Sequence, residues 1–280
     1  MKKNRLTLAF SPCPNDTFIF DALVNKKIET GNFEFEVIME DVETLNRWAL
    51  QERLDITKIS YGIWPMVQET YVLLNSGSAV GRGTGPLLIG KSKVQDPIPE
   101  FREHIQNLRV AIPGEHTTAN LLFSMAFPLA NHKKFMLFSE IESAVLKEEA
   151  DYGVIIHESR FTYAQKGLQK VMDLGDYWEK EIGVPIPLGG IVMKKKFQRE
   201  TIQQVDQLIR NSIKHAFSNY PDLPEYVRKH SQEMDEVVMR KHIDLYVNDY
   251  SMDLGEKGRN AVRKLVQVYE QAKGRSAIGQ

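Results

Sequence analysis

Five polar clusters in the sequence each follow directly after a short apolar run. They lie at residues 11–16, 41, 60, 115–118 and 157–159. In an open parallel sheet, the loops that follow the carboxyl ends of the strands gather along one edge, and ligands bind there. If the apolar runs are strands of two facing sheets, the five clusters line one cleft. We therefore expect a small-molecule site between two sheets.

His157 ends the apolar run 154–156, which places an imidazole at the mouth of this cleft. An imidazole exchanges a proton near neutral pH because its unperturbed pKa is about 6.5. A histidine that only packs and hydrogen-bonds within the scaffold is an equally good interpretation of this position. Glu158 could assist His157, but consecutive strand residues point to opposite faces. The other six histidines have poorer positions and lie at 104, 116, 132, 215, 230 and 242.

A second candidate element is the segment 114–118, Gly-Glu-His-Thr-Thr, which leads into an apolar helix predicted over 121–127. Backbone N–H groups and hydroxyls at a helix N-terminus suit a carboxylate or another anion. An ordinary capped helix explains the same residues. The glycine-rich segment 81–85 resembles an anion-binding loop but lacks the lysine and the spacing of a nucleotide-binding loop. We interpret it as a connector, with Arg82 as a candidate ligand.

Cys13 is the single cysteine and lies between two prolines, which make the turn 11–16 rigid and suitable for lining a site. A nucleophilic role would need a base that no local pattern supplies, so we interpret Cys13 as a small buried thiol. A lone cysteine excludes an internal disulfide and a cysteine-based metal cage. The sequence also lacks zinc motifs such as His-Glu-x-x-His and a dinucleotide-binding fingerprint, so we expect neither a metal nor a redox cofactor.

The bulk composition is that of a folded globular chain. Its 280 residues leave room for two lobes that each bury a core. With 42% hydrophobic and 26% charged residues, a predominantly disordered chain is excluded. Thirty-six basic residues against thirty-seven acidic ones leave no excess positive charge for a phosphate backbone, so we expect no nucleic-acid partner. The sequence carries no indication of the oligomeric state.

The amino terminus has three basic residues before the apolar run 6–10. This run is shorter than the core of an export signal, which spans roughly 7–15 residues, and Pro12 occupies the position where a small residue would precede a modified cysteine. No stretch approaches the ~18–20 continuous apolar residues of a membrane span. We therefore expect a cytoplasmic protein with no membrane partner.

Strand and helix patterns alternate along the first two-thirds of the chain, which is typical of an α/β fold with largely parallel sheets. Strands are predicted at 6–10, 33–40, 56–60, 86–89, 109–112 and 153–156. Asn15 or Asp16 can cap a helix over 17–26, and Asp41 can cap one over 42–54. Near the carboxyl terminus, apolar residues at helical spacing predict helices over 202–217 and 262–269.

Two proline-containing segments, 93–100 and 185–190, are interpreted as crossings between lobes. We therefore expect a discontinuous large lobe of residues 1–92 and 188–280, and a small lobe of residues 93–187. The cleft would lie between them.

Two long and chemically unusual segments resemble one enzyme family. The opening Ser-Pro-Cys-Pro-Asn-Asp-Thr-Phe-Ile-Phe (11–20) and the segment Ile-His-Glu-Ser-Arg-Phe-Thr-Tyr (156–163) are similar to 1,4-dihydroxy-6-naphthoate synthase, an enzyme of the futalosine route to menaquinone. Shorter matches follow in the order of that family, at 40–46, 57–61, 81–83 and 116–118. The resemblance covers nearly the whole chain and is weakest in the final helices.

The resemblance implies a fold similar to the two-lobed (type II) periplasmic binding proteins, with each lobe a mostly parallel sheet flanked by helices. It implies a lyase that converts cyclic dehypoxanthine futalosine, a carboxylate, to 1,4-dihydroxy-6-naphthoate without a cofactor. His157 matches the proton acceptor of the family. Matches to its substrate-contacting segments are Lys58, Ile59, Ser60, Thr117, Thr118 and Ala119. From the polar clusters we add Asn15, Asp16 and Asp41 to the expected substrate-binding residues.

Two alternatives stay open. Chorismate dehydratase of the same pathway is similar in fold but lacks the Ser-Pro-Cys-Pro-Asn-Asp opening. A carboxylate-binding protein that performs no chemistry would use the same scaffold, and the missing export signal argues against it. The scaffold alone does not separate these functions, because it hosts both transport and catalysis. The identity of the motifs and His157 favour the synthase.

Overall fold

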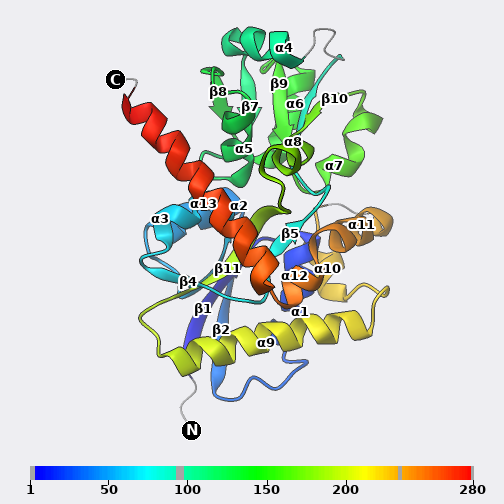
Figure 1. The fold of residues 1–280 in the computed structure, drawn as a ribbon. Helices are drawn as coiled ribbons and strands as arrows, with labels where there is room; N and C mark the ends of the chain where they lie inside the picture. The colour runs from blue at the N-terminus through cyan, green and yellow to red at the C-terminus, as the bar shows by residue number, and fades with distance from the viewer. Residues whose placement is uncertain (1–3, 93–97, 233–234, 279–280) are drawn as a thin grey trace.

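The computed structural model describes residues 4–92, 98–232 and 235–278, and it places two β-sheets in two lobes, each flanked by helices (Figure 1). The first sheet has the strand order β2-β1-β3-β11-β4, with β5 paired to β11. Its strands are β1 (Asn4–Phe10), β2 (Phe33–Met39), β3 (Ile56–Ser60), β4 (Tyr71–Leu73), β5 (Ala79–Gly81) and β11 (Ile186–Lys194). The α/β class and the two-sheet architecture expected from the sequence are confirmed.

The second sheet has the order β10-β6-β9-β7-β8. Its strands are β6 (Leu87–Gly90), β7 (Val110–Ile112), β8 (Lys133–Phe135), β9 (Tyr152–Ile155) and β10 (Gln169–Asp173). Within the described residues, β1 pairs in parallel with β2 and β3, β7 pairs in parallel with β8 and β9, and the other strand pairs are antiparallel. Since β6 and β11 run antiparallel to their neighbours, both sheets are mixed, and the expectation of mostly parallel sheets fits only these central strands.

The first crossing between the lobes lies earlier in the chain than predicted, as the sheet to which β6 belongs shows. β6 pairs within the second sheet, so the chain leaves the first sheet after β5, within residues 82–86, earlier than the predicted crossing at 93–100. Residues 93–97 of that prediction lie outside the described residues, and helix α4 (Ile98–His104) follows them. β11 begins at Ile186, within the predicted return crossing at 185–190. A short apolar strand carries no mark of the sheet it will join, which is why the sequence placed the boundary too late.

Helix α1 is buried along its whole length in the first lobe. The helices of this lobe are α1 (Pro14–Val24), α2 (Val42–Leu50), α3 (Trp64–Val67), α9 (Arg199–Ser218), α10 (Glu225–His230), α11 (Glu236–Tyr246) and α12 (Asp249–Met252). Phe18 and Phe20 of α1 belong to the same core as Ile209 and Ile213 of α9, which confirms the predicted apolar face of α9. A helix covered on all sides cannot shift without disturbing the core. The amino end of α1 is therefore held rigidly.

The second lobe is covered by α5 (Thr118–Ala126), α6 (Ile141–Leu146), α7 (Ser159–Thr162) and α8 (Leu174–Ile182) together with α4. The long helix α13 (Gly255–Ile278) runs from the first lobe toward the second (Figure 1). Val262 and Leu265 of α13 are buried in the core that contains Phe123 and Trp178 of the second lobe, whereas Val266 and Tyr269 of the same predicted face are only partly buried. Among the described residues, no helix is long and apolar enough to span a membrane.

Candidate active site

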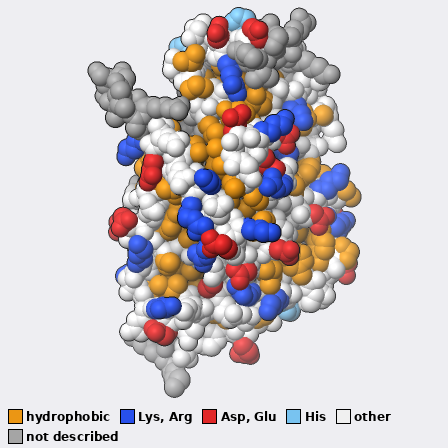
Figure 2. All heavy atoms as spheres, in the orientation of Figure 1, with side chains coloured by type: hydrophobic (Ala, Val, Ile, Leu, Met, Phe, Trp, Pro, Cys, Tyr) orange, Lys and Arg blue, Asp and Glu red, His pale blue; other side chains and the backbone are white. Residues whose placement is uncertain are grey.

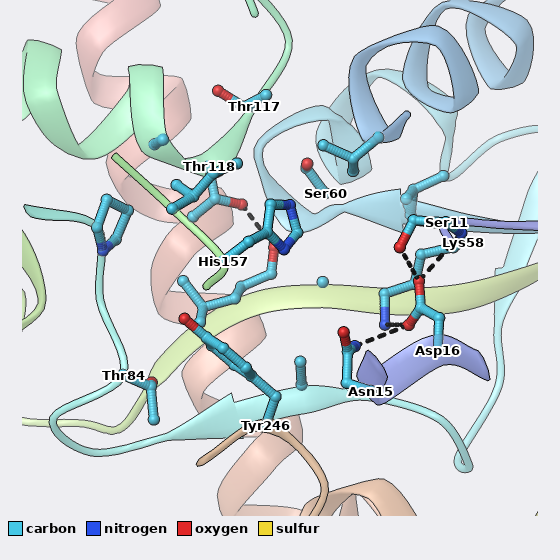
Figure 3. Close-up of a pocket in the computed structure, with 18 residues that line it drawn as sticks. Ser11, Asn15, Asp16, Lys58, Ser60, Thr84, Thr117, Thr118, His157 and Tyr246 are labelled. Carbon is cyan, nitrogen blue, oxygen red and sulfur yellow. Dashed lines mark hydrogen bonds and ion pairs between the residues drawn. The ribbon is translucent and has the colours of Figure 1, made fainter. Parts of the chain in front are cut away.

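A hollow between the two lobes collects nearly all the polar clusters of the sequence (Figure 3). Nine of the ten expected site residues line this hollow, namely His157, Lys58, Ile59, Ser60, Thr117, Thr118, Ala119, Asn15 and Asp16. The hollow encloses about 660 Å³ of space between protein atoms, a figure that includes its open mouth. On the face drawn in Figure 2, basic and acidic side chains alternate, so that face offers no patch of one sign.

A buried ion pair joins β3 to the start of α1. Lys58 Nζ lies 2.9 Å from Asp16 Oδ1, and both side chains are less than a tenth exposed. Asp16 Oδ2 accepts a hydrogen bond of 2.7 Å from Ser11 Oγ, and Asp16 Oδ1 also accepts from Asn15 Nδ2 at 2.8 Å. A buried pair survives only when its remaining polar atoms are satisfied in this way. The pair therefore fixes a charged, preorganised side of the hollow.

The amino end of α5 forms the opposite side of the hollow. Thr117 is the N-cap and accepts from the Asn120 N–H, while its own hydroxyl donates to the Gly114 carbonyl at 3.0 Å. The Thr118 hydroxyl donates to the Leu188 carbonyl at 2.8 Å. Both hydroxyls are thus already used, and the first N–H groups of the helix are what this end offers to an anion. The predicted helix starts earlier than expected, at Thr118, because Thr117 caps it.

Ser60 supplies a further donor beside this helix end. Its Oγ accepts a hydrogen bond of 3.1 Å from Asn46 Nδ2. A hydroxyl carries one proton as well as two lone pairs, so the Ser60 proton stays available to a ligand. The Ser60 hydroxyl and the α5 end are both at the hollow.

The two lobes touch around the hollow. The His116 N–H donates to Glu43 Oε2 at 3.0 Å, and Asn46 Nδ2 donates to the His116 carbonyl at 3.0 Å. Burial raises the pKa of Glu43, and the His116 N–H partly offsets this. A Cβ on Gly62 would lie 2.8 Å from the Thr117 carbonyl carbon, so only glycine permits this approach. The structure therefore shows the lobes in contact.

His157 does not continue the strand β9, which ends at Ile155. Its backbone φ is +56°, a left-handed conformation that is rare for residues other than glycine and is found at functional sites. Because of this turn, residues 157 and 158 do not alternate between two faces as strand residues do, and the expectation that Glu158 points away from His157 is wrong. The Cys13 sulfur, a His157 ring nitrogen and a Glu158 carboxylate oxygen lie within 4.8 Å of one another.

The His157 ring is held by three neighbours. Nδ1 lies 3.5 Å from Cys13 Sγ, the Phe138 ring centroid is 4.8 Å away, and the His242 ring stacks at 5.9 Å with an interplanar angle of 8°. Burial lowers the pKa of His157 to about 4, with the Asp16 carboxylate acting in the opposite direction. The imidazole is therefore neutral at pH 7 and can accept a proton.

The thiol of Cys13 is buried, as predicted. Burial, reinforced by the Glu158 carboxylate, raises its pKa well above the ordinary value, so it stays protonated. The base that no local pattern supplied is His157, which is 144 positions away in the sequence. A protonated thiol beside a neutral imidazole is not an activated nucleophile. Cys13 contacts the candidate base without replacing it.

Two residues of α11 line or support the site, and neither of them was predicted from the sequence as a site residue. Tyr246 lines the hollow, and His242 Nε2 lies 2.8 Å from Asn15 Oδ1. Because Asn15 Nδ2 donates to Asp16, its oxygen faces His242, which must then donate from Nε2. The two residues are four apart on one helix face beside buried Met239 and Ile243. That spacing was the signal that could have identified them.

Three expectations on individual residues are corrected. Among the described residues, Asp41 does not line the hollow; its carboxylate accepts from the Glu43 and Thr44 N–H groups and caps α2, as its position before the helix also predicted. Arg82 pairs with Glu179 at 2.9 Å and is 57% exposed, so it is not placed as a ligand. Helix α1 starts at Pro14 with Cys13 as N-cap, because proline is favoured in the first turn.

Two mixed sheets with a hollow between them place the chain among the periplasmic-binding-protein-like folds. The periplasmic aliphatic sulphonate-binding protein of Escherichia coli superimposes with a TM-score of 0.66 over 96% of this chain and 87% of its own, at 9% identity, and so shares the fold alone. The crystal structure of a protein from Archaeoglobus fulgidus is more similar, with a TM-score of 0.88 and 34% identity over 96% and 98% of the two chains.

The family follows from sequence comparison. A family model described as menaquinone biosynthesis matches residues 6–271. Relatives named 1,4-dihydroxy-6-naphthoate synthase are 43% identical in Thermus thermophilus, over 93% of this chain and 92% of theirs, and 38% identical in Streptomyces coelicolor, over 95% and 93%. The chain belongs to this menaquinone-biosynthesis family and is an enzyme that acts on a small molecule. The resemblance stated from the motifs is confirmed.

Proposed function

We propose that the chain is a lyase that converts cyclic dehypoxanthine futalosine to 1,4-dihydroxy-6-naphthoate. The observation that carries this proposal is a neutral imidazole, His157, in a hollow that is also lined by the amino end of helix α5. A carboxylate substrate held at that end has its reacting part within the space that His157 faces. The two relatives that bear the synthase name support the same reaction.

His157 is the general base in this proposal. In the neutral tautomer whose Nδ1–H donates to Cys13 Sγ, Nε2 carries the lone pair and accepts the proton from the substrate. Loss of that proton opens the ring, a sugar-derived fragment leaves, and formation of the aromatic naphthalene supplies the driving force. The Asp16 carboxylate favours the protonated imidazole, which stabilises the charge that develops during proton transfer.

The substrate carboxylate is bound in this proposal by the first N–H groups of α5, at Thr118 and Ala119, and by the Ser60 hydroxyl. The hydroxyls of Thr117 and Thr118 hold the loop and β11 instead, because both already donate within the protein. Lys58 stays paired with Asp16 at the same hollow. Hydrogen bonds to a charged group are about twice as strong as neutral ones, so this end orients the substrate.

Closure of the lobes over the substrate completes the proposal. The crossings at 82–86 and near Ile186 act as hinges, and the contacts of His116 with Glu43 and Asn46 hold the closed form. Closure excludes water from the base and the departing proton.

The direct test is incubation of the purified chain with cyclic dehypoxanthine futalosine, followed by mass spectrometry for the naphthoate. We expect conversion by the wild type and by His132→Asn, a control at an exposed histidine, and little by His157→Asn. Tight binding with unchanged recovery of the substrate would indicate a binding protein. Loss of water from chorismate by the chain would indicate the dehydratase.

A further inference from the structure

Three side chains with metal-binding chemistry meet behind the hollow. The thiol of Cys13, the imidazole of His157 and the carboxylate of Glu158 each offer one atom, and these atoms lie within 4.8 Å of one another. Cys13 and Glu158 are buried, and His157 is partly buried. Thiolate, imidazole and carboxylate are the ligands that zinc takes in proteins. They come from the turn before α1 and the turn after β9, so no short sequence motif joins them.

The spacing of the first two donors already fits a zinc ion. Tetrahedral coordination with Zn–S of about 2.3 Å and Zn–N of about 2.0–2.1 Å separates sulfur from nitrogen by about 3.6 Å. Cys13 Sγ and His157 Nδ1 are 3.5 Å apart. Binding would therefore require little movement of either side chain.

His242 supplies an independent observation. It is fully buried, and its Nε2 is held by Asn15 Oδ1 at 2.8 Å, so Nδ1 carries the lone pair. That Nδ1 has no hydrogen-bond partner and lies 3.8 Å from Glu158 Oε2. A buried lone pair directed at a carboxylate is costly unless a cation or proton lies between them. A histidine whose second nitrogen donates to an oxygen is also the usual arrangement of a metal ligand.

The charges balance when a divalent ion is added. Binding releases the thiol proton, since thiolate is the ligand form, and leaves a thiolate and a carboxylate beside two neutral imidazoles. Lys58 and Asp16, two of the other charges that act on His157, form an ion pair with each other at 2.9 Å. A zinc ion would therefore give a buried group with no net charge, which avoids the cost of an isolated buried charge.

We propose that Cys13, His157 and Glu158, with His242 as the fourth donor, bind a zinc ion. The ion would coordinate His157 and so block the general base of the proposed reaction. The metal takes no part in turnover. Since it uses the His157 ring and the cysteine behind it, zinc-bound enzyme has no free base, so zinc is an inhibitor of this enzyme. The binding itself does not depend on the proposed function; only the inhibition does.

The test uses the whole chain, freed of metal with a chelator and titrated with Zn²⁺ against a chromophoric chelator. We expect one zinc per chain, with affinity weakened at least about tenfold in Cys13→Ser, Glu158→Gln and His242→Gln. Cd²⁺ in place of Zn²⁺ should give a thiolate-to-metal charge-transfer band that Cys13→Ser abolishes. His132→Ala, at an exposed histidine, is the matched control and should bind as the wild type does.

Equal zinc affinity in the wild type and Cys13→Ser, or binding lost only in His132→Ala, would overturn the proposal. Circular dichroism shows whether each variant is folded, and Cys13→Ser and Glu158→Gln are close in size to the wild-type residues, so either one suffices. These readouts need no substrate, so they hold even if no naphthoate is formed.

Discussion

Lowering the pH from 7 to 5 should destabilise this protein through His157 in particular. The folded chain holds the pKa of His157 at about 4, mainly by burial, whereas an unfolded chain restores it to about 6.5. Between these two values the unfolded chain binds a proton that the folded chain does not. Stability is therefore fully present above about pH 6.5 and falls as the pH drops toward 4.

The magnitude follows from the two pKa values. The full depression, from about 6.5 to about 4, corresponds to about 3 kcal/mol of unfolding free energy, of which about 2 kcal/mol is lost by pH 5. The assay is urea unfolding followed by circular dichroism at pH 5, 6 and 7. The comparison is between the wild type and His157→Asn, because asparagine tolerates the left-handed backbone at this position.

The variant should lose about 2 kcal/mol less than the wild type between pH 7 and pH 5. His242, whose pKa is lowered mainly by burial and further by the His157 imidazole, is present in both proteins, so the part of its pH dependence that burial causes cancels in the comparison. His132→Asn should follow the wild type, because that side chain is exposed. If His157→Asn and the wild type lose stability in parallel, His157 is not held neutral by burial and the reasoning fails.

Three further outcomes are expected. His157→Asn should lower turnover by roughly 100-fold or more, as loss of a general base does, and near-normal turnover would remove it from that role. Asp16→Asn should cost about 3–5 kcal/mol in urea unfolding because it leaves Lys58 charged and buried, and adding Lys58→Met should restore part of it. Gly62→Ala should raise KM by pushing the lobes apart, and small-angle scattering should show compaction with product in the wild type but less in this variant.

The sequence predicted the site better than it predicted the path of the chain. Polar residues after apolar strands identified the hollow because the ends of parallel strands gather at one edge, which is true of β1, β3, β7 and β9. The cap at Asp41 could be predicted locally, since a cap is a contact between residues close in sequence. The first lobe crossing was misplaced because pairing of β6 depends on distant strands.

The contacts around His157 were out of reach for a different reason. Cys13 and His242 approach the base from distant parts of the chain, and only the packing of α1 and α11 brings them together. The left-handed turn at His157 was equally invisible, because it reverses the alternation that a strand would impose. Long-range packing, rather than local propensity, decides these contacts.

The central claim is that substrate lies between the amino end of α5 and His157. It is tested most directly by a crystal structure of His157→Asn with cyclic dehypoxanthine futalosine bound. We expect the substrate carboxylate at the Thr118 and Ala119 N–H groups, and the atom that gives up its proton within about 3.5 Å of the side chain at position 157. A substrate bound outside the hollow, or bound in it with that atom directed away from position 157, would contradict the account.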